Sequence, residues 1–301
     1  MKQIKLGQSG LTVGCVAYGC WRFAGTSAAD ARKKIETALD HGMTLIDTAD
    51  IYGFGEPAGF GGAEALLGEV LAGTPGLRDR MVLATKGGIT PPTPYDSSYD
   101  YLIAACKASL TRLNTDFVDL YQIHRPDLLA PMPETARALN DLVKQGHVRH
   151  IGVSNFTVSQ TRALQAHLDV PIVTTQPEFS AWHQDPITDG TLDWASETGA
   201  ACLAWSPLAG GRLATGQPGE EDDPVRFGAI LSTLDRLADA HKVDRTTIAL
   251  AFTLRHPAGI IPIIGTQRTD RIIEAATAAT VQLSRRDWYD LVEARRGAPM
   301  P

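Results

Sequence analysis

The sequence predicts an α/β protein built as a single (β/α)8 barrel across residues 1–301. Short apolar segments alternate with amphipathic segments along the chain, and each repeat takes roughly the thirty residues of a β–α–β unit. Eight such repeats fit into 301 residues, the usual size of one barrel, with no Gly-, Pro- or Ser-rich linker between them. An open, doubly wound sheet shows the same alternation and remains an alternative.

Eight apolar segments have the composition of buried strands. Several of them, such as MVLAT and ACLAW, are almost continuous apolar runs, as expected for a parallel sheet covered on both faces. The predicted strands are Val13–Gly19, Thr44–Asp47, Met81–Lys86, Phe117–His124, Val148–Ser154, Pro171–Gln176, Ala201–Ser206 and Ile260–Gly265.

The segments between these strands have the amphipathic pattern of helices. The clearest predicted helices are Ser27–His41, Ala63–Leu71, Tyr99–Leu113, Pro133–Gln145 and Thr157–Ala166. Two other features extend the barrel beyond its eight repeats, one at each end of the chain.

At the N-terminus, a Gly–Gln–Ser–Gly turn between two short apolar pieces predicts a β-hairpin that closes the barrel bottom.

Extra helices are expected near the C-terminus, because the chain between the last two strands is too long for one crossover helix. We predict a polar loop at Ala209–Pro224, then helices at Val225–His241 and Thr246–Arg255. A further surface helix follows the eighth unit, with Ser284 as its N-cap.

Composition excludes several functions. The net charge is −6 and the basic residues form no run, so neither nucleic acid nor a membrane surface is an expected partner. No segment approaches the roughly 20 apolar residues that span a bilayer. The four scattered cysteines indicate reduced thiols, and we expect a cytoplasmic protein. The sequence shows no metal-binding pattern and no coiled coil, so we expect no metal site and take a monomer as the default.

Four polar side chains stand at the ends of three successive predicted strands. Asp47 ends one strand and Tyr52 follows it, Lys86 ends the next strand, and His124 ends the third. Each alone has an ordinary structural explanation, such as a turn cap or a hydrogen-bonded histidine. Lys86 is the hardest to explain that way, because a lysine facing a barrel interior needs a partner there. Together, at the carboxyl ends of neighbouring parallel strands, they predict an active site.

These four residue types suit the reduction of a carbonyl group by hydride, which needs an acid near the carbonyl oxygen. A phenol has a pKa of about 10, and a nearby ammonium lowers it by stabilising the phenolate. We therefore expect Tyr52 to donate the proton, Lys86 to tune it, Asp47 to anchor Lys86, and His124 to orient the carbonyl oxygen.

Seven sequence blocks in this order and spacing resemble the aldo-keto reductase superfamily along nearly the whole chain. They are LIDTADIYG, LATKGG, LYQIHRPD, VRHIGVSNF, TTQPEFS, AWSPLAGG and PIIGT. The resemblance implies a barrel that uses NAD(P)H without a Rossmann domain, acts on small-molecule carbonyl substrates, and carries the tetrad in the roles above.

The resemblance also implies where a nicotinamide ring is held. Ser154 and Asn155 are expected to hydrogen-bond its carboxamide, together with Gln176; alternatively, the first two simply cap the helix that begins near Thr157. Trp205 stands where the family usually carries a tyrosine that stacks on the ring, although a tryptophan there could equally belong to the core. Trp21 is also expected at the cofactor.

The remaining cofactor contacts are expected after the last two strands. Small residues after the seventh strand let backbone N–H groups approach a pyrophosphate, and the free N–H groups of a helix follow the eighth. The expected contacts are Ser206, Leu208, Gly210, Arg212, Gly265 and Thr266. By resemblance, one or both of Arg268 and Arg271 contact the 2′-phosphate, which favours NADPH while leaving NADH possible; two exposed arginines on a helix are the alternative. Ala275 departs from the family's frequent asparagine.

Loops should select the substrate. Aromatic residues at Trp21, Phe23, Phe54 and Phe60 suggest apolar or aromatic aldehydes, and FGEPAGFGG is interpreted as a loop near the site although GFGEPA formally matches GxGxxA. Two other functions remain open at this point. One is a cofactor-binding regulatory subunit with little turnover, and the other is a lyase or isomerase that forms a Schiff base on Lys86.

Overall fold

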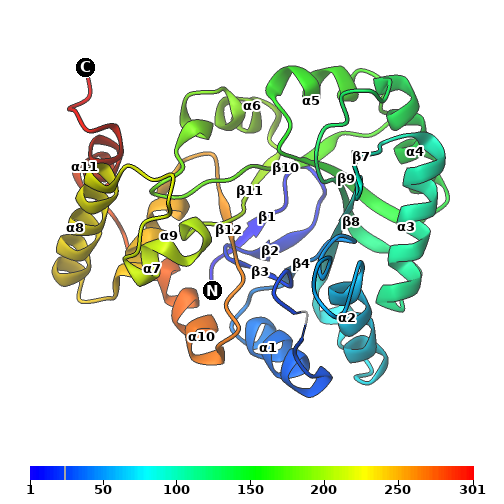
Figure 1. Cartoon of the computed structure of the whole chain (residues 1–301), viewed down its shortest axis with the longest axis horizontal. Helices are drawn as coiled ribbons and strands as arrows, with labels where there is room; N and C mark the ends of the chain where they lie inside the picture. Colours follow the sequence, from blue (N-terminus) through cyan, green and yellow to red (C-terminus); the bar gives the residue numbers. More distant parts are fainter. Residues whose placement is uncertain (24) are drawn as a thin grey trace.

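The computed structural model describes residues 1–23 and 25–301, and its central element is a closed barrel of eight parallel strands (Figure 1). The predicted (β/α)8 fold is confirmed. The doubly wound alternative is wrong, because the last strand of the barrel pairs with the first through Ile263 and Ala17. The barrel strands are β3 (Ala17–Gly19), β4 (Leu45–Asp47), β5 (Val82–Gly87), β8 (Val118–Ile123), β9 (Val148–Ser154), β10 (Ile172–Gln176), β11 (Ala201–Ala204) and β12 (Ile261–Ile264).

Helices surround this barrel (Figure 1). Neighbouring helices pack in chain order from α1 to α5, and α10 returns to pack against α1. The α-helices are α1 (Ala28–Asp40), α2 (Gly62–Ala72), α3 (Tyr99–Leu113), α4 (Met132–Lys144), α5 (Val158–Gln165), α6 (Thr191–Thr198), α7 (Arg212–Thr215), α8 (Pro224–His241), α9 (Arg245–Arg255), α10 (Thr269–Thr277) and α11 (Arg285–Arg296). Short 3-10 helices are η1 (Arg78–Arg80), η2 (Asp185–Ile187), η3 (Ala209–Gly211) and η4 (Ala278–Thr280).

The barrel has two apolar layers because successive strand residues point to opposite faces. Leu45, Ala84 and Leu120 belong to the cluster inside the barrel, whereas Ile46 and Leu83 pack in the larger cluster between strands and helices. Both faces are therefore apolar, which explains the nearly continuous apolar runs in the sequence.

The predicted N-terminal hairpin is confirmed as β1 (Gln3–Lys5) and β2 (Thr12–Gly14), which pair in antiparallel fashion. It lies across the centre of the ring of strands in Figure 1, and Leu6 and Val13 join the interior cluster. The prediction of one strand at Val13–Gly19 is wrong in detail. The chain divides there between the hairpin and β3, since the hairpin has to leave the sheet to close the barrel end.

The predicted helices near the C-terminus are also confirmed. Helix α8 begins at Pro224, and the Asp223 carboxylate caps it by accepting from two backbone N–H groups. Ser284 caps α11 as predicted and forms a capping box with Asp287. The α8 and α11 helices pack together outside the ring (Figure 1).

Two loops contain more structure than the sequence indicated. The predicted polar loop Ala209–Pro224 includes η3 and the one-turn helix α7. After β5, strands β6 (Ile89–Thr90) and β7 (Thr93–Tyr95) form a small hairpin that the strand pattern did not predict. Over the described residues, no helix has both the length and the apolar character that crossing a bilayer requires.

We expect Gly7→Ala to destabilise the protein by about 3 kcal/mol. Gly7 has a φ of 57°, and a Cβ atom there would lie 2.2 Å from the backbone oxygen of Val173. The substitution would therefore force the hairpin away from the barrel end as well as strain the turn. Urea unfolding followed by circular dichroism measures this loss.

Gly10→Ala in the same turn is the matched control. Gly10 has a φ of 79°, but a Cβ atom there would meet nothing within 4 Å. It should cost only the backbone strain, about 1 kcal/mol. Equal losses in the two variants would show that the contact with Val173 is unimportant.

Candidate active site

The four predicted catalytic side chains meet at the carboxyl ends of β4, β5 and β8. Asp47 is the last residue of β4, Lys86 lies near the end of β5, and His124 directly follows β8. The strand register pairs Asp47 with Ala84 and Lys86 with Gln122, so Lys86 lies two residues beyond the partner of Asp47, and His124 lies two residues beyond the partner of Lys86. Tyr52 lies in the turns after β4.

Lys86 is the centre of this group. Its side chain is fully buried, and its Nζ donates to Asp47 Oδ2 at 2.6 Å, the Thr48 carbonyl oxygen at 2.9 Å and Tyr52 Oη at 3.1 Å. An ammonium has three N–H donors, and all three are used here. Because the Tyr52 oxygen accepts from Lys86, the phenol keeps its own proton available for another acceptor.

Amide side chains hold the other oxygen of Asp47. Gln176 Nε2 donates to Asp47 Oδ1 at 3.1 Å, and Gln122 Nε2 lies 3.5 Å from the same oxygen. The Gln176 amide, which we expected at the nicotinamide carboxamide, therefore directs its N–H toward Asp47. The amide oxygen of Gln176 is then the atom available for the expected contact with the nicotinamide carboxamide.

The environment sets the protonation of these groups. Burial alone would lower the pKa of Lys86, but Asp47 and Tyr52 raise it to about 12. Desolvation raises the pKa of Tyr52 above its ordinary value, and Lys86 opposes that rise only in part. We expected Lys86 to lower the pKa of Tyr52, but in the protein without cofactor that pKa is raised. Burial, Lys86 and Arg125 hold the pKa of His124 well below its usual range, so its imidazole is neutral at pH 7.

Tyr52 and His124 face a pocket of about 960 Å³. The two rings meet edge to face with centroids 5.8 Å apart, and the ring centroid of Trp21 lies 6.5 Å from that of Tyr52. Every catalytic and cofactor-binding residue predicted from the sequence lines this pocket except Lys86, which lies beneath Tyr52. Of the aromatic residues predicted at the substrate, Trp21 lines it and Phe23, Phe54 and Phe60 do not.

Ser154 and Asn155 open onto the pocket and do not cap the next helix. Thr157 is the N-cap of α5 and forms a capping box with Gln160, so the alternative of a simple helix cap is wrong. Asn155 bridges the site, since Nδ2 donates to the His124 carbonyl oxygen at 3.2 Å and Oδ1 accepts from Trp205 Nε1 at 3.0 Å. Trp205 therefore lines the pocket and is no core residue.

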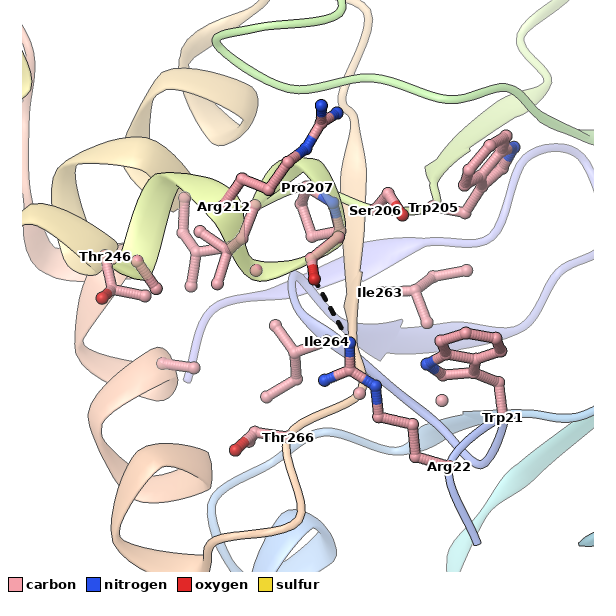
Figure 2. Close-up of a pocket in the computed structure, with 18 of the residues that line it drawn as sticks. Trp21, Arg22, Trp205, Ser206, Pro207, Arg212, Thr246, Ile263, Ile264 and Thr266 are labelled. Carbon is pink, nitrogen blue, oxygen red and sulfur yellow. Dashed lines mark hydrogen bonds between the residues drawn. The ribbon is translucent and has the colours of Figure 1, made fainter. Parts of the chain in front are cut away.

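Glycines leave the pocket open after β11. Gly210 and Gly211 have φ values of 69° and 100°, and a Cβ atom on either would meet nothing within 4 Å. From the opposite side Arg22 reaches across the pocket, and its Nη2 donates to the Gly210 carbonyl oxygen at 3.3 Å (Figure 2). Backbone groups at this position are thus accessible to a pyrophosphate.

Arg212 is arranged differently from our expectation of a free charge at this position. Its guanidinium forms an ion pair with Asp222, and its Nε donates to the Ala209 carbonyl oxygen at 2.8 Å. In Figure 2 it points away from Arg22. This ion pair joins two parts of the loop after β11. It also neutralises the charge of Arg212, which we had expected to act on a phosphate.

The far end of the pocket is formed by the start of α10. Gly265 and Thr266 precede the helix, and Arg268 and Arg271 lie at its first turn. The guanidinium of Arg268 is held by Asp270 through two hydrogen bonds. Within residues 1–23 and 25–301, Arg271 forms no ion pair.

Sequence reasoning missed Arg125 and misplaced Phe23. Arg125 lines the pocket beside His124, with its guanidinium carbon 5.8 Å from the centre of the Trp205 ring. Its position directly after a strand-end histidine was a usable signal. Phe23, expected at the substrate, is instead fully buried against Tyr18.

Comparison with known proteins identifies the family. The sequence profile of the aldo/keto reductase family matches residues 15–296. The chain belongs to this family. It is an enzyme, an oxidoreductase of the aldo-keto reductase type, and the family's chemistry is the reduction of carbonyl compounds.

Relatives of this aldo-keto reductase cover nearly its whole length. It is 52% identical to a 6-dehydroglucose reductase of Novosphingobium aromaticivorans, over 99% of this chain and 96% of that protein. A 6-dehydroglucose reductase of Agrobacterium fabrum is 39% identical, over 97% of both. The crystal structure of the thermostable aldo-keto reductase Tm1743, in complex with the inhibitor epalrestat, superposes with a TM-score of 0.82 at 28% identity and covers 98% of this chain and 100% of that one.

The buried pair of Asp47 and Lys86 should show strong coupling in a double-mutant cycle. Either Asp47→Asn or Lys86→Met leaves one charge buried alone, and each should cost about 3–5 kcal/mol of unfolding free energy. The double variant should lose clearly less than the sum, since neither charge then remains. Chemical denaturation of the four proteins measures the coupling.

The exposed pair of Asp40 and Arg80 is the control for this cycle. Asp40→Asn and Arg80→Met should couple by no more than about 1 kcal/mol, since solvent screens both charges. Additive losses at Asp47 and Lys86 would contradict the description of Lys86 as the centre of the site.

Proposed function

We propose that this enzyme reduces an aldehyde or ketone to an alcohol with NADPH, and that Tyr52 supplies the proton. The observation that carries the proposal is the position of the Lys86 ammonium, which donates to both Tyr52 and Asp47 beneath an open pocket. A phenol with an ammonium behind it and space in front of it is arranged to protonate a carbonyl oxygen.

The protein groups divide the work as follows. When bound, the nicotinamide ring supplies a hydride to the carbonyl carbon. Tyr52 gives its proton to the carbonyl oxygen as negative charge develops there, and the Lys86 ammonium stabilises the phenolate that remains. Asp47 keeps that ammonium charged and in place. His124, which is neutral, donates a hydrogen bond to the same oxygen without adding a charge.

The pocket fits a nicotinamide dinucleotide along its length. Ser154, Asn155 and the oxygen of Gln176 would meet the carboxamide, and the indole of Trp205 would pack against the ring. The backbone at Ser206, Leu208 and Gly210 would hold the pyrophosphate, with Gly265 and Thr266 on the opposite side. Arg271 would meet the 2′-phosphate and favours NADPH over NADH, and Arg268 would add to this only after leaving Asp270.

We further propose a sugar aldehyde as the substrate. Two relatives that cover almost the whole chain are 6-dehydroglucose reductases, which act on glucose oxidised to an aldehyde at carbon 6. Trp21 presents an indole surface beside Tyr52 on which the C–H face of a pyranose can pack, and Arg125 presents several N–H donors for its hydroxyl groups. These groups suit a hydroxylated substrate better than the aromatic aldehydes suggested by loop composition.

Tyr52→Phe should lower kcat for 6-dehydroglucose by roughly 10²- to 10⁴-fold, because the proton donor is lost. NADPH binding should survive, since the phenol oxygen contributes no expected cofactor contact. NADPH oxidation followed by absorbance, together with titration of tryptophan fluorescence by NADPH, separates the two effects.

Tyr95→Phe, at an exposed tyrosine outside the pocket, is the control and should leave turnover unchanged. Equal turnover in Tyr52→Phe and the native enzyme would overturn the assignment of the acid. Tight NADPH binding with no turnover of any aldehyde by the native enzyme would overturn the proposed reaction.

Arg125→Met should raise KM for the sugar aldehyde by about tenfold with little change in kcat, because hydrogen bonds made equally before and during the reaction are lost. The same variant should reduce benzaldehyde as well as the native enzyme does. If both substrates were affected equally, Arg125 would not be a determinant of sugar recognition.

A further inference from the structure

A fully buried glutamine on β8 reaches the Asp47 carboxylate and has no role in the reaction as proposed. Gln122 does not line the pocket, yet its Nε2 lies 3.5 Å from Asp47 Oδ1 and donates to it. The preceding inward residue of the strand, Leu120, belongs to the apolar cluster inside the barrel. An amide buried in such surroundings costs free energy unless both of its ends are hydrogen-bonded.

Thr174 fixes the direction in which this amide points. Its hydroxyl donates to Gln122 Oε1 at 3.2 Å, so the oxygen end of the amide faces β10 and the N–H end faces Asp47. Both side chains are fully buried. If the amide turned over, its oxygen would face the carboxylate, and two acceptors would then repel each other. The pair of Gln122 and Thr174 therefore presents a donor to Asp47 in a single orientation.

A glycine makes the contact between Gln122 and Thr174 possible. In the strand register, one row across β5, β8, β9 and β10 contains Lys86, Gln122, Gly152 and Thr174. Strand β9 thus lies between the two side chains. A Cβ atom on Gly152 would lie 2.0 Å from Thr174 Oγ1 and 2.9 Å from Gln122 Cγ, so any other residue would separate them. The register of β10 shifts just before Thr174, and such a bulge re-aims the side chains that follow it.

Asp47 needs this second donor because its other amide partner has a further task. Asp47 Oδ2 accepts from Lys86 at 2.6 Å, and Oδ1 accepts from Gln176 at 3.1 Å. Gln176 lines the pocket and is expected to meet the nicotinamide, so a bound nucleotide pulls on the same amide that holds Asp47. Gln122 lies outside the pocket, and its hold on Asp47 is independent of the nucleotide.

We propose that Gln122 is a positioning residue that holds Asp47 against Lys86 whether or not a nucleotide is bound. The Lys86 ammonium then stays behind the Tyr52 oxygen throughout the reaction, so this inference rests on the proposed role of Tyr52 as the acid. Gln122 itself touches neither substrate nor cofactor and acts through Asp47. Its loss therefore slows the reaction step without weakening the binding of either ligand.

Gln122→Met tests this, because methionine is close to glutamine in size but has no N–H to donate. We expect kcat for 6-dehydroglucose to fall by roughly tenfold, since a buried carboxylate loses one hydrogen bond. KM and the dissociation constant of NADPH should change by no more than about twofold. NADPH oxidation followed by absorbance gives the kinetic constants, and tryptophan fluorescence gives the nucleotide affinity.

Gln165→Met is the matched control, since Gln165 is also bonded at both ends of its amide. Its Nε2 donates to the Val170 carbonyl oxygen at 3.0 Å and its Oε1 accepts from the Ile172 N–H at 2.7 Å, outside the active-site pocket. This variant should lower stability in urea unfolding and leave kcat unchanged. An equal fall of kcat in both variants would reduce the effect of Gln122 to general destabilisation and overturn its role.

Two combined variants show through which groups Gln122 acts. In the Tyr52→Phe background, Gln122→Met should change the residual single-turnover rate by no more than about twofold, because the acid that it serves is already absent. A tenfold loss in both backgrounds would contradict a path through Tyr52. Thr174→Val removes the orienting hydroxyl and should lower kcat by roughly threefold alone but not further in Gln122→Met. A full additional loss there would overturn the orienting role of Thr174.

The outcomes separate this inference from the function on which it rests. An active native enzyme with an unchanged kcat in Gln122→Met would overturn the inference and leave the proposed function standing. Tight NADPH binding without turnover of any aldehyde by the native enzyme would overturn the proposed function, and the inference would fail with it.

Discussion

The active site depends on one buried cation. The Lys86 ammonium has no access to water, and removing such a charge from water costs several kcal/mol unless it is paired and fully hydrogen-bonded. Asp47, Thr48 and Tyr52 meet that requirement together, and all three lie at the end of β4 or just after it. The adjacency of β4 and β5 in the closed barrel is therefore the structural condition for the chemistry.

This cation also sets the protonation of its neighbours. Together with burial, which is the larger effect, its positive charge keeps His124 neutral, and its hydrogen bond occupies the oxygen of Tyr52 while leaving the phenol proton unused. In the proposed reaction the site therefore contains one acid, Tyr52, and one neutral hydrogen-bond donor, His124. A protonated histidine would offer a second acid, and burial, together with the charges of Lys86 and Arg125, lowers the pKa of His124 and removes that possibility.

The two halves of the pocket differ in the groups that line them. After β11 the wall includes Gly210 and Gly211, where no side chain covers the backbone, and the pyrophosphate of a dinucleotide suits such a wall. Near Tyr52 the wall is made of the side chains of Trp21, Arg125 and Trp205, and these can vary without disturbing the strands.

The sequence by itself determined the barrel, the hairpin, the extra helices and the positions of the tetrad, because strand periodicity, helix caps and strand-end polar residues are local properties of the chain. Tertiary structure alone decided the division between β2 and β3, the pairing of Arg212 with Asp222, and the burial of Phe23. It also decided that Gln176 turns toward Asp47. Each of these depends on which side chains, distant in sequence, meet in space, and a charged or polar group takes the partner that the fold brings within hydrogen-bonding distance.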